Sequence, residues 1–322
     1  MKPLRVAVVG AGAFGRNHAR VLSRMPGVEL VAIADVDLER AEQLAGEYGT
    51  QACAEMHDLR GQIDAATIAT PTITHEAVAT ELLSSGVDVL IEKPIADSAE
   101  GGARLTRLAE ENGQILQVGL LERFNPAVIE LGKQCTTPLF FEVHRLSVFT
   151  PRSLDVDVVL DLMIHDLDIV LSLMGEQPRE IRAAGISILS KKVDIANVRL
   201  SFGSGCVANL TASRVSTEQV RKLRLFQPGE YLAVDYQRQD LVRLRILPNE
   251  LQIGLEQVAI QRDEPLQLEL AAFVKAVRER GRPKVDGRQA TEALRLAEEI
   301  LVTIKEHAQT VSRTIARRGK HS

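Results

Sequence analysis

A buried strand that runs directly into a glycine-rich turn constrains this chain more than any other feature. Residues 6–9 are apolar and mostly β-branched, which is typical of a parallel strand covered on both faces. Three glycines follow at the spacing G-x-G-x-x-G: Gly10, Gly12 and Gly15. Gly10 permits a tight turn, Gly12 lets a phosphate approach the backbone closely, and Gly15 lets the next helix pack tightly on the strand.

The residues around this turn fit a dinucleotide site better than a turn that binds nothing. An amphipathic helix begins near Phe14, directly after Ala13, so its free N–H groups and its dipole would face an incoming anion. A second apolar strand, residues 29–34, ends in Asp35. This acid lies about 20 residues past the last glycine, where a carboxylate is needed for the adenosine ribose hydroxyls.

Length and composition describe an ordinary globular chain. At 322 residues it can form two domains, and 45% of its residues are apolar. No apolar run approaches the ~20 residues of a membrane span, and Gly10 interrupts the only stretch that resembles a signal peptide. We therefore expect a cytoplasmic protein. Its three cysteines, Cys53, Cys135 and Cys206, are far apart, so we expect small buried side chains rather than disulfides.

The charge pattern gives little support to nucleic-acid binding. The net charge is −4, aromatic residues make up 3%, and there is no tryptophan. Basic residues gather only in the last segment, 313–322, which we expect to be a frayed, solvated tail.

Strand and helix patterns alternate as far as residue 119, which predicts an α/β domain with a parallel sheet and helices on both faces. Ligands bind beyond the carboxyl ends of such strands. Two further motifs fall at those ends: Thr70-Pro71, with His75 in the helix that follows, and Glu92-Lys93-Pro94. We expect them beside the glycine turn.

The pattern changes after residue 120. Most segments from 139 to 236 are strand-like, and a long helix at 156–174 and two closing helices complete the chain. This predicts an α+β domain with an antiparallel or mixed sheet. We place a dinucleotide-binding domain at 1–120, a second domain at 121–312 and the tail at 313–322.

Lys93 is a candidate catalytic residue. In a partly dry cleft beside a cationic nicotinamide its pKa would fall, so it could orient a substrate hydroxyl and move its proton. A Lys–Pro bond can be cis, which would fix the direction of this side chain. The alternative is a surface Lys–Glu pair.

The helix at 157–174 carries Asp161, His165 and Asp168 at the spacing i, i+4, i+7 among apolar neighbours. These three side chains share one helical face. His165 is a candidate general base, oriented by Asp161. A solvated face and a metal site are the alternatives, and we expect no metal because hydride transfer to a nicotinamide needs none.

Residues near the domain crossover can serve a substrate. Arg123 can meet an anion, and Asn125 can bind ligand near the nicotinamide or cap the helix that begins at Pro126. Arg145 and Arg214 are further candidate anchors for a diphosphate.

Together these motifs resemble the Gfo/Idh/MocA oxidoreductases (glucose–fructose oxidoreductase, inositol dehydrogenase and related enzymes). They occur in the order of that family and cover nearly the whole chain. The resemblance implies a Rossmann domain followed by a domain with a large, open-faced, mostly antiparallel sheet. It implies Lys93, Asp161 and His165 as the catalytic group. It also implies a homodimer or homotetramer formed through the sheet face.

Three segments, at 122–127, 162–168 and 212–216, are similar to the branch that oxidises UDP-N-acetylglucosamine at C3 in lipid A precursor synthesis. One departure is that residues 155–160 lack the glycines that many members have before the Asp-x-x-x-His segment, which leaves the substrate geometry open.

The sequence thus predicts an enzyme that oxidises a secondary hydroxyl of a sugar or UDP-sugar by hydride transfer. NAD is favoured over NADP, because Asp35 would repel a 2′-phosphate and Val36-Asp37 supply no cation. Either Lys93 or His165 can be the base. The alternatives are a free-sugar or inositol dehydrogenase and, in another class, a dinucleotide-binding sensor without catalysis.

Overall fold

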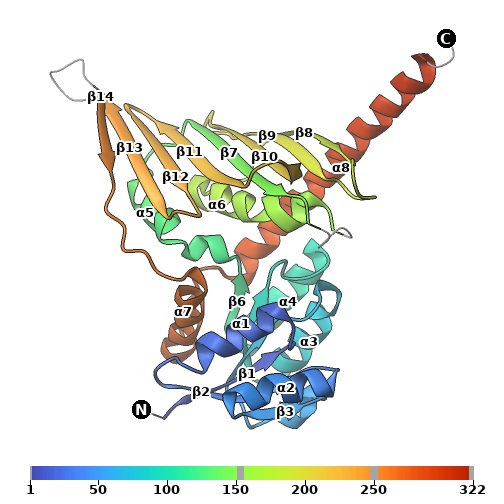
Figure 1. Cartoon of the computed structure of the whole chain (residues 1–322), viewed down its shortest axis with the longest axis vertical. Coiled ribbons are helices and arrows are strands. Elements are labelled where there is room, and N and C mark those ends of the chain that lie inside the picture. Colours follow the sequence, from blue (N-terminus) through green and yellow to red (C-terminus); the bar gives the residue numbers. More distant parts are fainter. Residues whose placement is uncertain (1, 151–155, 247–252, 319–322) are drawn as a thin grey trace. The chain divides into compact units, whose positions relative to one another are not determined.

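The computed structural model describes residues 2–150, 156–246 and 253–318, which form two compact units (Figure 1). Unit 1 comprises Met1–Phe124 and Asp263–Glu292, and unit 2 comprises Asn125–Arg262 and Ala293–Ser322. Asp155, which belongs to the stretch that departs from the family, and tail residues 319–322 lie outside the described residues.

Unit 1 contains the predicted parallel sheet. Its six strands all pair in parallel, in the order β3-β2-β1-β4-β5-β6. The strands are β1 (Leu4–Val9), β2 (Val28–Ala34), β3 (Gln51–Cys53), β4 (Ala65–Ile68), β5 (Asp88–Glu92) and β6 (Leu116–Gly119). The described side chains of the central strands are almost wholly buried, as expected for a sheet with both faces covered.

Helices connect these strands, and their ends follow the sequence signals. They are α1 (Ala13–Leu22), α2 (Leu38–Tyr48), η1 (Met56–Leu59), α3 (Thr72–Ser84), α4 (Ala99–Asn112) and η2 (Leu121–Phe124). Asp37 caps α2 by accepting from the N–H of Arg40, and Ser98 caps α4 by accepting from that of Gly101. The loops that follow β2 and β5 are therefore held on one side by the strand and on the other by a capped helix.

One helix falls in a different unit from the one expected. Helix α7 (Pro265–Glu279) belongs to unit 1, not to the second domain. Its buried Leu270 and Phe273 join a core with Val6 and Leu22. The apolar periodicity of a helix shows which face is buried, but it does not show which core that face covers.

Unit 2 is built on an eight-stranded sheet in the order β14-β13-β12-β11-β7-β10-β9-β8. Only β7 and β10 pair in parallel among these strands, and the other neighbours are antiparallel. The strands are β7 (Phe140–Val148), β8 (Glu180–Ile186), β9 (Ile195–Ser201), β10 (Val207–Ser216), β11 (Val220–Gln227), β12 (Glu230–Asp235), β13 (Asp240–Ile246) and β14 (Ile253–Gln257). The expectation of a mostly antiparallel sheet is confirmed, and β13 and β14 extend it beyond the predicted strands.

Helices cover one face of this sheet (Figure 1). They are α5 (Pro126–Gln134), the π-helical turn η3 (Val159–Met163), α6 (Ile164–Met174) and the part of α8 (Gly287–Arg318) that lies in unit 2. Helix α8 runs further than predicted and includes residues 313–318 of the expected tail. Among the described residues, no helix combines the length and apolar character needed to cross a membrane.

Candidate active site

The glycine turn has the geometry that its sequence predicts. Gly10 has φ +101°, and a Cβ there would lie 2.6 Å from the carbonyl oxygen of Ala69. A Cβ on Gly15 would lie 1.7 Å from the Gly10 carbonyl oxygen, so α1 can pack this closely on β1 only with glycine. A Cβ on Gly12 would meet nothing within 4 Å, which leaves open space above the backbone.

The amino end of α1 suits an anion. Gly12 is its N-cap, no side chain caps it, and its first turn has no acidic residue. Its free N–H groups therefore face the open space above Gly12, where they can bind a phosphate.

Asp35 lies beside this turn, at the end of β2. Its side chain is largely buried, and its carboxylate accepts from the N–H of Ala11 at 2.7 Å and from that of Asp37 at 2.9 Å. The Arg40 guanidinium lies 3.9 Å from the Asp35 carboxylate and 3.2 Å from that of Asp37. The expectation that Val36 and Asp37 supply no cation did not consider Arg40, which the structure places beside Asp35. Arg40 reaches back from the first turn of α2, three residues after its cap.

Large apolar side chains are exposed at three of the strand ends. Phe14 follows β1 and is 59% exposed, Val36 follows β2 and is 96% exposed, and Ile73 follows β4 and is 80% exposed. Single exposed apolar side chains are common on protein surfaces; these three have in common that each lies just after the carboxyl end of a strand of the parallel sheet. Sequence reasoning identified Phe14 but missed Val36 and Ile73, which carry no motif of their own.

The Thr70-Pro71 segment and His75 lie after β4. Pro71 is the N-cap of α3, and the Thr74 hydroxyl donates to the Thr70 hydroxyl at 2.8 Å. His75 is buried, with Nε2 2.9 Å from the Thr70 carbonyl and Nδ1 2.9 Å from the Pro94 carbonyl. Burial lowers the pKa of His75, although these two carbonyls act against it. Its ring thus joins the loops that follow β4 and β5.

Lys93 is half-buried at the end of β5, and its bond to Pro94 is cis. The preceding carboxylate, that of Glu92, lies 2.9 Å from Nε2 of His18 on α1. His18 is fully buried. No sequence pattern connects it with this loop, because it lies 74 positions away.

In unit 2, Asp161 lies in the π-helical turn η3, and His165 lies in the first turn of α6. Both side chains are half-buried, whereas Asp168 is buried. The expected stripe of three polar residues therefore divides: two reach the surface of the unit and the third lies inside. The π turn has no signature in the sequence, although such turns are frequent at functional sites.

A buried ion pair supports the helix that carries His165. Asp166 accepts from Nε and Nη2 of Arg145 at 2.7 and 2.8 Å, and the hydroxyl of Tyr236 lies 3.3 Å from the same carboxylate. The Arg145 guanidinium also stacks 5.0 Å from the Tyr236 ring centroid. Arg145 is therefore part of the core of unit 2, where Asp166 and Tyr236 occupy its guanidinium.

The other anchor candidates differ in position. Arg214 is buried, donates to the Val156 carbonyl and lies 3.8 Å from Asp194, so it too is internal. Arg123 is half-buried in unit 1 and donates to the Lys284 carbonyl at 3.4 Å. Asn125 is the N-cap of α5 and also donates to the Tyr236 carbonyl at 2.9 Å, which confirms its capping role.

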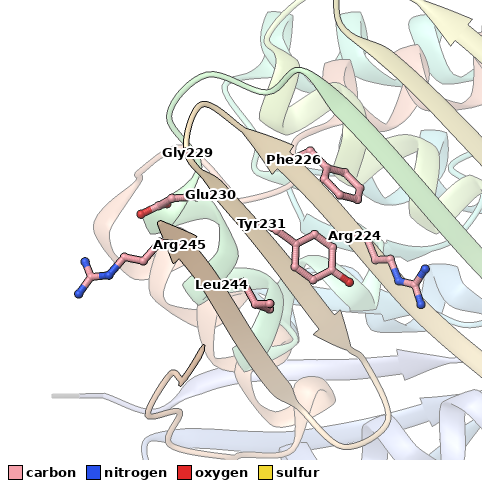
Figure 2. Close-up of a pocket in the computed structure, with 7 residues that line it drawn as sticks. All are labelled: Arg224, Phe226, Gly229, Glu230, Tyr231, Leu244 and Arg245. Carbon is pink, nitrogen blue, oxygen red and sulfur yellow. The ribbon is translucent and has the colours of Figure 1, made fainter. Parts of the chain in front are cut away.

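A separate pocket of about 460 Å³ lies on the outer face of the unit 2 sheet, opposite the helices that carry Asp161 and His165 (Figure 2). The side chains of Phe226, Tyr231 and Leu244 line it, with Arg224 and Arg245 at its sides. Phe226 pairs across strands with Tyr231, and Tyr231 pairs with Leu244. The pocket is thus part of an apolar row across the sheet.

The comparisons with known proteins agree with this arrangement. The model of the oxidoreductase family with an NAD-binding Rossmann fold matches residues 4–120, and the GFO/IDH/MocA C-terminal domain matches residues 139–226. A UDP-N-acetylglucosamine 3-dehydrogenase from Acidithiobacillus ferrooxidans is 39% identical over 72% of this chain and 74% of its own length. The chain belongs to the Gfo/Idh/MocA oxidoreductase family.

Solved structures of the family share this fold. A crystal form of the A. ferrooxidans enzyme superimposes with a TM-score of 0.90 at 34% identity, over 95% of this chain and 99% of that one. Among the relatives found by sequence, an inositol 2-dehydrogenase from Rhizobium meliloti is 27% identical over 95% of this chain and 98% of its own length. The family is one of dehydrogenases, and the present chain has the fold and the motifs of its members.

The predicted residues thus fall into two groups. The glycine turn, Asp35, Thr70-Pro71, Glu92 and Lys93 follow neighbouring strands of unit 1. Asp161 and His165 lie on consecutive turns in unit 2.

Proposed function

We propose that this chain oxidises the C3 hydroxyl of UDP-N-acetylglucosamine and uses NAD as the acceptor. The observation that carries the proposal is the match to the A. ferrooxidans UDP-N-acetylglucosamine 3-dehydrogenase along 95% of this chain. The features of unit 1 support the choice of cofactor, and Lys93, Asp161 and His165 support the chemistry.

The residues of unit 1 fit a dinucleotide. We assign the pyrophosphate to the N–H groups at Gly12, Ala13 and Phe14, because the backbone there is open and the helix end is positive. Asp35 would bind the adenosine ribose, and Val36 would cover the adenine. Thr70, Pro71 and the Glu92-Lys93 turn would border the nicotinamide half. A bound nicotinamide would accept the hydride at its C4 atom.

We propose NAD over NADP because the Asp35 carboxylate would repel a 2′-phosphate. Arg40 already pairs with Asp35 and Asp37, so its charge is largely offset there.

Lys93 and His165 would act on the substrate hydroxyl. An amine or an imidazole within hydrogen-bond reach of that hydroxyl can take its proton as the hydride leaves the same carbon. Asp161, one turn before His165, would favour the protonated imidazole that results. Arg123 is our candidate for binding the substrate phosphates. Asn125, two residues further along the chain, would hold the start of α5 in place.

We further propose that a second copy of this chain covers the outer face of the unit 2 sheet. Five apolar side chains, each paired with the next across strands, form a row on that face: Phe140, Phe226, Tyr231, Leu244 and Leu255. Leu255 is 70% exposed and Phe226 is 37% exposed, so the row is a surface that self-association would bury. Light scattering should show a dimer or tetramer that Tyr231→Asp dissociates, whereas Gln43→Glu, exposed on α2 of unit 1, should not.

The inositol dehydrogenases among the relatives make a cyclitol the second candidate substrate. Thermal-shift measurements with NADH present separate the two. UDP-N-acetylglucosamine should raise the melting temperature, because a ligand that binds only the folded state stabilises it. A shift with myo-inositol and none with the sugar nucleotide would instead support the cyclitol.

A further inference from the structure

A buried cluster of three titratable side chains lies behind the Lys93 turn, within unit 1. His18 comes from α1, Glu92 from the end of β5 and Glu269 from α7. His18 and Glu269 have no exposed surface, and one nitrogen or oxygen of each residue lies within 4.8 Å of the others. Neither the glycine fingerprint nor the proposed hydride transfer uses Glu269.

The Glu269 carboxylate is unusual in its surroundings. Among the described residues, neither of its oxygens has a hydrogen-bond partner, although its main-chain carbonyl accepts from Gln117 at 3.1 Å. Burial raises the pKa of Glu269 well above its ordinary value of 4.5, and the nearby Glu92 carboxylate raises it further. An ionised carboxylate in such a place would be strongly disfavoured.

Glu269 is fully buried and only 14% of the Glu92 side chain is exposed, so charges on both carboxylates at this separation would be strongly disfavoured without a cation between them. The Nε2 atom of His18, 2.9 Å from Glu92, can donate its proton to that side chain. The proton of the pair therefore belongs on Glu269, which is fully buried and has no hydrogen-bond donor at either oxygen among the described residues. Charged residues also lie on a second element that packs against α7. This element is helix η2, which carries Glu122 and Arg123, and the Arg123 guanidinium donates to the Lys284 carbonyl.

We propose that Glu269 is a neutral carboxylic acid which, together with His18, positions Glu92 and hence the adjoining Lys93. The Glu92 carboxylate packs closely against the backbone of Gly119, where a Cβ would lie 3.2 Å from both carboxylate oxygens. This packing restricts the Glu92 side chain. A protonated Glu269 would donate to Glu92 from the α7 side, while His18 donates from the α1 side. The claim about Lys93 rests on the proposed function, but the claim about the proton does not.

Infrared spectroscopy tests the proton directly. At neutral pH the unmodified chain should show the carbonyl stretch of a protonated carboxylic acid, and Glu269→Gln should abolish it. Glu264→Gln is the matched control, because Glu264 begins the same helix but is exposed and pairs with Arg20. This variant should keep the band. Absence of the band in the unmodified chain, or its survival in Glu269→Gln, would overturn the proposal.

Kinetics test the positioning. Glutamine has the shape and the donor capacity of a neutral glutamic acid, so Glu269→Gln should keep kcat within about threefold, whereas Glu269→Leu should lose about tenfold or more with little change in NADH affinity. Equal loss in both variants would contradict a neutral, donating Glu269. Metal analysis tests the alternative that a bound cation, and not a proton, neutralises the two carboxylates. A stoichiometric divalent ion that is present in the unmodified chain and lost in Glu269→Gln would overturn the proposal. If no variant turns over any substrate but the infrared band behaves as expected, the proposed function fails and the protonated Glu269 stands.

Discussion

The carboxylate of Asp35 accepts a hydrogen bond from the main-chain N–H of Ala11 at 2.7 Å. This contact joins the end of β2 to the glycine turn that follows β1. The residue that we assign to the ribose therefore also fixes the loop that we assign to the pyrophosphate. A change at Asp35 should affect both, and the choice between NAD and NADP separates the two effects.

We expect Asp35→Ser to reverse or abolish the preference for NAD. Loss of the carboxylate removes the repulsion of a 2′-phosphate and leaves Arg40 available to pair with it. The ratio of kcat/KM for NAD to that for NADP should fall by about 100-fold, roughly 2.7 kcal/mol. Glu39→Gln is the matched control, because it removes an exposed charge from the first turn of α2 and leaves Asp35, Asp37 and Arg40 unchanged; it should leave the ratio unchanged. An unchanged ratio in Asp35→Ser would show that Asp35 does not contact the ribose.

Lys93→Ala should separate binding from chemistry. Because we assign the amine to the substrate hydroxyl, kcat should fall by about 10² to 10⁴-fold, the usual range for loss of a general acid or base. NADH affinity, measured by fluorescence titration, should change little. Lys133→Ala removes an exposed lysine that pairs with Glu130 on α5 and should leave both quantities as they are. Full turnover in Lys93→Ala would eliminate the proposed mechanism.

Two alanine substitutions for glycine should have opposite effects on stability. Gly15→Ala would place a Cβ 1.7 Å from the Gly10 carbonyl, so the chain should unfold at a much lower temperature or fail to fold. Gly46 lies exposed in α2 with nothing within 4 Å of a Cβ, so Gly46→Ala should stabilise the chain by about 0.5–1 kcal/mol. Denaturant unfolding measures both. A harmless Gly15→Ala would contradict the close packing of α1 on β1.

Acid stability should depend on Asp194, which is buried in unit 2. Burial alone would raise its pKa, but the Ser190 hydroxyl and the N–H groups of Ser190, Ile188 and Leu189 outweigh burial and lower the pKa to about 2. The ordinary value is 3.8, so the folded state favours the ionised form. Its stabilising effect is complete above that value and is lost as the pH falls from about 4 to about 2. Asp194→Asn should lower the melting temperature near neutral pH and flatten its fall over this interval, whereas the exposed Asp58→Asn should do neither.

The sequence predicted the parts of the site that depend on local patterns. Gly10, Gly15 and Asp35 occupy a short fingerprint whose spacing follows from backbone geometry. Asn125 followed by proline predicted a helix cap that the structure shows. The Lys93–Pro94 bond is cis, which the sequence identified as possible because a proline follows the lysine.

What the sequence could not supply depends on distance along the chain. His18, Glu92 and Glu269 meet only because α1 and α7 pack beside the sheet, and no periodicity connects residues so far apart. The same limit applies to Arg145, whose residue type suggested an anion site but whose partner, Asp166, is buried with it. The π turn at Asp161 was also missed, because one extra residue in a helical turn leaves the apolar pattern almost unchanged.

The fate of the C3 hydrogen tests the central claim most directly. The chain would be incubated with NAD and UDP-N-acetylglucosamine deuterated at C3, and the NADH formed would be measured by mass spectrometry and NMR. We predict one deuterium at C4 of the nicotinamide for each 3-oxo sugar nucleotide produced, and formation of both products about 10² to 10⁴-fold more slowly with Lys93→Ala. NADH that forms without deuterium, or no NADH with the sugar nucleotide while myo-inositol is oxidised, would contradict the proposed reaction.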